Sequence, residues 1–178
     1  FVIKYTFERS ADKSFKYYFI RRFIRLYIPL FFIYVLGYLL KCYNAGELAS
    51  PEWGTLLGNL FMLQDVISQK PNVLSATYMG NGVLWSLSYE WWFYMLYYVL
   101  ATRIPAEKIN KWVSIMVVTA AATYLIYPFI ANRLIMYFAI WWIGVRFAET
   151  YLRGGGFSFK QILPYAGVLL VICGILGL

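Results

Sequence analysis

The sequence predicts an all-α protein, a polytopic bundle of transmembrane helices, and three observations lead to that fold class. Of the 178 residues, 62% are hydrophobic and only 13% are charged. The mean hydropathy of +0.61 is far above that of a soluble domain of this length. The hydrophobic residues also gather in long runs, and most Lys and Arg residues lie between these runs, as in the loops of membrane proteins.

Four apolar runs are each long enough to cross a bilayer as a helix, if tilt and interfacial flanking residues are allowed for. A fifth run begins near Gln161 and breaks off at Leu178, with Pro164 tolerated in its first turn. The sequence therefore predicts about five spans. The four full spans are expected over residues 23–40, 83–102, 112–131 and 134–148.

The short polar segment between the third and fourth runs is expected to end one helix and start the next. Pro128 should kink the third span near its end, because proline removes a helical hydrogen bond. Asn132 and Arg133 should then form a tight turn into the fourth span.

Residues 53–68 form a shorter apolar segment that decides the topology. Two glycines and Asp65 make it more typical of an interfacial or re-entrant helix than of a span. If it does not cross, the outside keeps only Lys41, Lys70 and Arg133, and the other basic residues are cytoplasmic, as the positive-inside rule requires. We therefore expect residues 1–22 to be cytoplasmic and residues 42–82 to be extracytoplasmic.

Glu90 lies within the second predicted span, in a stretch that is otherwise uncharged. An acidic side chain inside a membrane helix costs roughly 2–3 kcal/mol, so it normally faces a protein interior or a wet cavity and takes part in function. Ser86, Tyr94 and Tyr97 recur at helical spacing with Glu90 and form one polar stripe. The stripe predicts a site in which Glu90 orients a partner base or accepts a proton from it, or binds an acceptor hydroxyl. A purely structural contact with a neighbouring helix is the alternative.

Three arginines, Arg21, Arg22 and Arg25, lie at the start of the first predicted span. Arg21 and Arg25 share a helix face, and Arg22 flanks it. The planar guanidinium suits phosphate, so this cluster predicts a site for a donor that carries phosphates. The alternative is a topology signal that binds lipid headgroups. Because the net charge of +8 is distributed between apolar spans, nucleic acid is not an expected partner.

The chain has two cysteines and no histidine, which argues against several kinds of site. Cys42 and Cys173 are far apart in sequence, so neither a zinc site nor a disulfide framework is predicted, and we expect no metal and no bound cofactor. The chain begins with Phe1 and ends within an apolar run. We therefore expect a single domain over residues 1–178 that is truncated at both ends.

Three segments carry distinctive motifs: residues 21–29 (RRFIRLYIP), 59–65 (NLFMLQD) and 84–94 (LWSLSYEWWFY). In order and spacing they resemble the acyltransferase-3 family of bacterial membrane O-acyltransferases. The first motif departs from the family pattern by one residue inserted before Pro29. The strong resemblance covers about residues 17–98, and residues 137–144 resemble a later family helix more weakly.

The resemblance implies an enzyme of the bacterial inner membrane with about ten spans. Such an enzyme takes an acyl group, commonly acetyl, from cytoplasmic acyl-CoA and delivers it to a hydroxyl of an exported or cell-surface glycan. The expected partners are thus acyl-CoA, a glycan acceptor and the lipid bilayer. The site residues implied are the catalytic Glu90, the donor-binding Arg21, Arg22 and Arg25, and the pocket residues Trp85, Ser86 and Tyr94.

Family members also carry an essential histidine in a span upstream of the first motif. Because this chain has no histidine, we expect it to be inactive by itself. Two other functions stay open. One is a polysaccharide transporter or flippase in which Glu90 couples protons, although the broken-helix repeats that would favour it are not seen. The other is a noncatalytic membrane scaffold.

Overall fold

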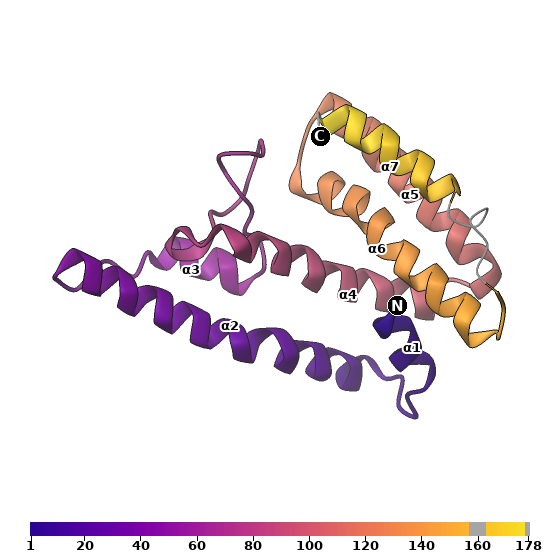
Figure 1. Ribbon diagram of the computed structural model, residues 1–178, viewed down its shortest axis with the longest axis horizontal. Coiled ribbons are helices and arrows are strands. Elements are labelled where there is room, and N and C mark those ends of the chain that lie inside the picture. The colour runs from indigo at the N-terminus through magenta and orange to yellow at the C-terminus, as the bar shows by residue number, and fades with distance from the viewer. Residues whose placement is uncertain (157–162, 177–178) are drawn as a thin grey trace. The chain divides into compact units, whose positions relative to one another are not determined.

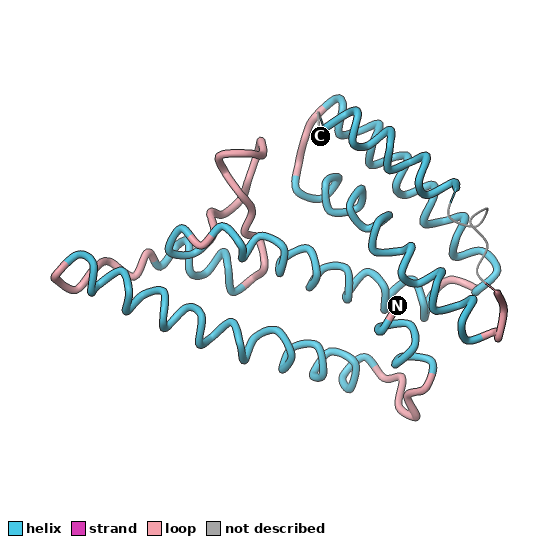
Figure 2. The backbone as a smooth tube through the Cα atoms, viewed as in Figure 1, coloured by secondary structure: helices cyan, strands magenta, loops and turns pink. Residues whose placement is uncertain are grey.

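The computed structural model describes residues 1–156 and 163–176, and the regular elements in that part of the chain are all helices (Figures 1 and 2). The predicted all-α class is therefore confirmed. The chain divides into two compact units. Residues 14–95 form the α2 unit, and residues 1–13 together with 96–178 form the α5–α6 unit. Each unit is described by itself.

Helix α2, Phe15–Ala45, is the longest element of the α2 unit. It begins after Ser14, whose Oγ accepts a hydrogen bond from the backbone N–H of Tyr17 at 3.4 Å, and it ends at Gly46, which has a φ of 70°. The predicted span 23–40 lies inside it. One side of the helix is buried at every fourth residue, which is the stripe of a helix packed along one face. The buried residues are Tyr18, Arg22, Leu26, Leu30 and Tyr34.

The chain continues through the short helix α3, Trp53–Leu60, to the 3-10 turns η1, Tyr78–Gly80, and η2, Gly82–Leu84. Eight helical residues rise only about 12 Å, so α3 is too short to cross a bilayer. This agrees with the expectation that residues 53–68 do not form a spanning helix. At Gly58 the backbone of α3 approaches Ser75 so closely that a Cβ would clash with the Ser75 hydroxyl.

Helix α4, Trp85–Arg103, corresponds to the second predicted span. Hydrogen bonds from the preceding loop fix its first turns. The Gln64 Nε2 donates to the Leu84 carbonyl at 3.1 Å, and the Ser88 hydroxyl donates to the Gln64 carbonyl at 2.9 Å. The Trp92 Nε1 donates to the Met62 carbonyl at 2.9 Å. The loop therefore holds the end of α4 that carries Glu90.

The α5–α6 unit packs four helices and the C-terminal part of α4. Helices α5 and α6 pack against each other. The buried residues Ile109, Val113 and Val117 of α5 recur at every fourth position. Trp142 Nε1 in α6 donates to Asn110 Oδ1 in α5 at 2.9 Å. The helices of this unit are α1, Val2–Glu8, α5, Ala106–Ile126, α6, Ile130–Leu152, and α7, Leu163–Leu176.

The junction between α5 and α6 corrects two expectations. Helix α5 ends at Ile126, so Pro128 lies between the helices and does not kink one of them. Asn132 and Arg133 belong to the first turn of α6, where Asn132 Oδ1 accepts a hydrogen bond from the Phe129 N–H at 2.9 Å. The turn itself spans residues 127–129. An asparagine can cap a helix from within its first turn. Asn132 does so here, and it was therefore wrongly expected in the turn between the helices.

Arg133, which the charge count assigns to the outer side of the membrane, has a side chain that is only 1% exposed. A charge count assigns Arg133 to a side of the membrane but does not show which face of the helix carries the side chain.

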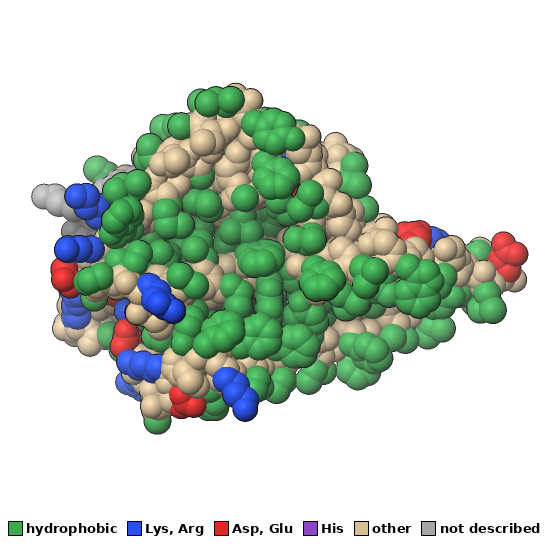
Figure 3. All heavy atoms as spheres, turned by 180° about the vertical axis from the view of Figure 1, so that it is seen from behind, with side chains coloured by type: hydrophobic (Ala, Val, Ile, Leu, Met, Phe, Trp, Pro, Cys, Tyr) green, Lys and Arg blue, Asp and Glu red, His purple; other side chains and the backbone are tan. Residues whose placement is uncertain are grey.

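Two helices in the described part of the chain are long and apolar enough to cross a membrane, α2 and α5. Helix α4, which is rich in Tyr and Trp, and helix α6, which carries Arg133, Arg146 and Glu149, are not among them. Hydrophobic side chains nevertheless dominate the visible surface (Figure 3).

The fifth predicted run is described only in part. Gln161 and Leu178 lie outside the described residues, and Pro164 is in the first turn of α7, as expected. Five spans thus stay a prediction.

Candidate active site

The centre of the candidate site is a contact between Glu90 and Tyr94, which are neighbours on α4. The Tyr94 hydroxyl donates a hydrogen bond to Oε1 of Glu90, as the four-residue spacing allows. Tyr94 is buried, whereas Glu90 is half-buried. Oε2 of Glu90 makes no hydrogen bond with any residue that the structure describes. The carboxylate is therefore held at one oxygen and open at the other.

Arg22 reaches this pair from α2 and is 8% exposed. Its guanidinium carbon lies 5.2 Å from the centre of the Tyr94 ring and 5.2 Å from the centre of the Tyr18 ring. The Tyr18 hydroxyl donates to the Tyr94 carbonyl at 2.9 Å. A cation against aromatic faces is attracted by their negative potential. Arg22 and Tyr18 together fix the tyrosine that holds Glu90.

Arg21 and Arg25, in contrast, are exposed on α2. The Arg21 guanidinium lies 5.3 Å from the centre of the Tyr17 ring. Neither arginine makes a hydrogen bond or an ion pair with another described residue. Their N–H groups are therefore available to a ligand from outside.

The other predicted residues of α4 have different neighbours. The Ser86 hydroxyl is exposed and donates to the Val83 carbonyl at 3.1 Å. The Trp85 ring has Lys70 Nζ above it, 3.7 Å from the ring centre. Tyr97 packs edge-on against Trp141 within the α5–α6 unit, with ring centres 5.7 Å apart. The structure pairs Tyr94 with Glu90 but directs Trp85 and Ser86 to these other groups.

Sequence reasoning missed a buried charge cluster at the start of α4. Asp65 is fully buried and accepts hydrogen bonds from Lys70 Nζ at 2.7 Å, from the Tyr89 hydroxyl at 2.6 Å and from the Val66 N–H at 2.8 Å. Lys70, which the charge count assigns to the outer side, has a side chain that is only 13% exposed. The signal for Asp65 was present, since it closes the second of the three motifs.

Tyr18 was missed as well, although a signal for it exists. It precedes Arg22 by four residues, and Leu26 follows at the same spacing, so the three residues share a helix face. The contact between Tyr18 and Tyr94 joins α2 to α4, and sequence periodicity alone does not show which helix faces which.

The described residues contain no group of three or more His, Cys, Asp or Glu side chains placed to hold a metal ion. A family model described as an acyltransferase domain matches residues 1–177 of the chain. The matched region includes both units and every residue of the candidate site. No curated protein and no solved structure matches significantly.

Proposed function

Because the chain belongs to this acyltransferase-3 family, we propose that it is part of a membrane O-acyltransferase. The enzyme transfers an acyl group, acetyl in the simplest case, from cytoplasmic acyl-CoA to a hydroxyl of an exported or cell-surface glycan. It is a multi-pass protein of the bacterial inner membrane, with residues 1–22 inside and residues 42–82 outside. Acyl-CoA takes part as a substrate and not as a resident cofactor.

The observation that carries this proposal is the Glu90 carboxylate, which Tyr94 holds at one oxygen and leaves open at the other. In the reaction the acceptor oxygen forms the new ester bond, the thioester C–S bond breaks, and the hydroxyl proton ends on the sulfur of CoA. Oε2 of Glu90 receives the hydrogen bond of the attacking hydroxyl, or orients the base that removes its proton. Arg22 supports this geometry through Tyr94 and is a positioning residue.

The donor is held by Arg21 and Arg25, whose exposed guanidinium groups suit the phosphates of acyl-CoA. Both lie in the N-terminal half of α2, which is on the cytoplasmic side in the proposed topology. The 178 residues contain no histidine, the side chain that titrates nearest to neutral pH. We therefore propose that a histidine outside these residues completes the site. Activity is accordingly measured on the gene product as the cell makes it.

Glu90→Gln tests the proposal, because glutamine keeps the volume of the side chain and removes its charge and basicity. We expect glycan acylation to fall by at least about 100-fold, the usual contribution of acid–base catalysis. The measurement is the O-acetyl content of surface glycan in a deletion strain that carries the variant. Glu47→Gln changes an exposed carboxylate outside the site and serves as the matched control.

The amount of surface glycan is measured in the same strains. Normal acylation by Glu90→Gln would exclude a catalytic role for Glu90. Loss of the surface glycan itself, rather than of its acyl groups, would favour a flippase.

A further inference from the structure

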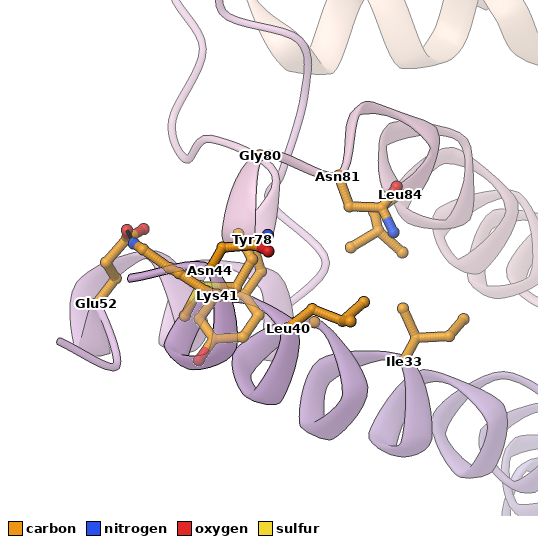
Figure 4. A pocket seen from close by; sticks show the side chains of 11 residues that line it. Ile33, Leu40, Lys41, Asn44, Glu52, Tyr78, Gly80, Asn81 and Leu84 are labelled. Carbon is orange, nitrogen blue, oxygen red and sulfur yellow. Dashed lines mark hydrogen bonds and ion pairs between the residues drawn. The ribbon is translucent and has the colours of Figure 1, made fainter. Parts of the chain in front are cut away.

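A cavity of about 490 Å³ lies in the α2 unit between the C-terminal turns of α2 and the segment formed by η1 and η2 (Figure 4). Its size is within the range of roughly 300–1,000 Å³ that is typical of small-ligand sites. Glu90, Tyr94 and the three arginines do not line it. The cavity is therefore a separate feature from the candidate active site.

The lining combines an apolar part with a polar part. Ile33 and Leu40 of α2 and Leu84 of η2 supply aliphatic surface (Figure 4). Asn44 of α2 and Asn81, between η1 and η2, supply carboxamides. Both asparagines are exposed, and their side chains make no hydrogen bond with any described residue. A carboxamide both donates and accepts hydrogen bonds, as a hydroxyl does. This combination suits a ligand with hydroxyl groups and an apolar face.

The charges at the cavity favour a neutral ligand. Lys41 and Glu52 both line it and form an ion pair with each other, so the lining has no net charge. A phosphate or a lipid headgroup would have to compete with Glu52 for Lys41. A sugar ring needs no counter-charge, and its C–H face can pack on Ile33 and Leu40.

The backbone that carries Asn81 is held in a defined and strained shape. Met79 has a φ of 52° and Gly80 a φ of 70°, and a residue other than glycine rarely adopts this left-handed conformation. The fully buried Asn59 fixes this segment, because its Oδ1 accepts a hydrogen bond from the Tyr78 N–H at 3.0 Å and its Nδ2 donates to the Ala76 carbonyl at 2.7 Å. A loop fixed in this way presents Asn81 to a ligand with little ordering cost.

We propose that this cavity binds a neutral, hydroxyl-rich unit of the acceptor, a sugar residue, and that Asn44 and Asn81 determine which sugar is accepted. The statement that the sugar belongs to an acceptor rests on the proposed function. The statement that the cavity binds a sugar rests on its own lining. In the proposed topology the cavity belongs to the extracytoplasmic side, where an exported glycan is found.

Sugar binding is tested without catalysis by saturation-transfer NMR on the protein in lipid nanodiscs, free of sugar-based detergent. The probes are the methyl glycosides of glucose, galactose, rhamnose and N-acetylglucosamine. We expect saturation of at least one glycoside by the wild type, and binding weakened roughly tenfold in the double variant Asn44→Ala and Asn81→Ala, since two hydrogen bonds are lost. Glu47→Ala, an exposed change outside the cavity, should bind as the wild type does.

A second variant, Asn44→Gln, lengthens an exposed helical side chain without changing the η1 segment, and it should also weaken binding. Absence of saturation transfer to all four glycosides in the wild type, or equal binding by the folded variants and the wild type, would overturn the proposal. Acyl transfer is measured separately in cell membranes. Sugar binding without acyl transfer would contradict only the proposed function. Acyl transfer that is unchanged when either asparagine is replaced would contradict only the proposed role of the cavity.

Discussion

At the scale of single residues, the three arginines of α2 have different surroundings although they form one cluster in the sequence. Arg22 is buried against the rings of Tyr18 and Tyr94, whereas Arg21 and Arg25 are exposed. Buried stacking favours a role in positioning, and exposed N–H groups favour ligand binding. Substitutions at these positions should therefore change different kinetic constants.

Arg22→Lys should lower kcat for acetyl transfer about tenfold and leave KM for acetyl-CoA unchanged. Lysine keeps the charge but loses the planar guanidinium, and a buried cation–π contact is worth about 1–2 kcal/mol. Arg25→Ala is the comparison, and it should raise KM for acetyl-CoA because a phosphate ligand is lost. Steady-state transfer from labelled acetyl-CoA in inverted membrane vesicles measures both. An equal rise in KM for the two variants would make Arg22 a donor ligand.

The sequence could predict the contact between Glu90 and Tyr94 because it is local, with the two side chains four positions apart on one helix. The contact of Arg22 with Tyr94 is not local. It depends on which face of α2 meets α4, and only the stripe of Tyr18, Arg22 and Leu26 indicated that face. The pair of Asp65 and Lys70 lies in an irregular loop, where no periodicity reports which side chains meet.

At the scale of elements, the loop before α4 holds the start of that helix through the buried pair of Asp65 and Lys70. Asp65→Ala should lower the free energy of unfolding by about 3–5 kcal/mol, because it leaves the Lys70 ammonium without its buried counter-charge. The measurement is tryptophan fluorescence during denaturant titration in mixed micelles. Glu47→Ala, an exposed acidic position in the same unit, is the control and should change little.

Adding Lys70→Met to Asp65→Ala should recover part of the lost stability, since the unpaired charge is then removed as well. If Asp65→Ala were no less stable than Glu47→Ala, the cluster would not hold the start of α4.

The helices themselves were largely predictable, but their ends were not. Hydropathy finds the part of a helix that suits hydrocarbon, and hydrogen bonding continues beyond it. Helix α2 therefore begins at Phe15 and passes through Lys16 and Arg21 before it reaches the predicted start at residue 23. Helix α5 ends before Pro128 because the residue that precedes a proline avoids the helical conformation.

At the scale of the whole molecule, the proposed topology predicts the access of four positions to reagents. Cysteines at Glu47 and Ser68 should react with an impermeant maleimide on intact cells, and cysteines at Ala106 and Gly155 only after the membrane is opened. All four positions are exposed, and Cys42 and Cys173 are first replaced by serine. Labelling of Gly155 from outside would reverse the sides of the loops that follow α4 and α6.

The family match extends over both units. We still propose that the two units form a single domain and that the chain has about five spans.

The length of α2 has a consequence for where a polymer meets this protein. Its 31 residues extend about 46 Å, roughly 16 Å more than the hydrocarbon core of a bilayer. Tilt can absorb part of this hydrophobic mismatch, and the remainder projects into the headgroup layers. In the proposed orientation the outer projecting turns carry Lys41 and Asn44, so the proposed sugar site lies where a glycan is still hydrated. In this proposal only the reacting hydroxyl moves deeper into the protein, toward Glu90. A thicker bilayer would place the proposed sugar site within the membrane.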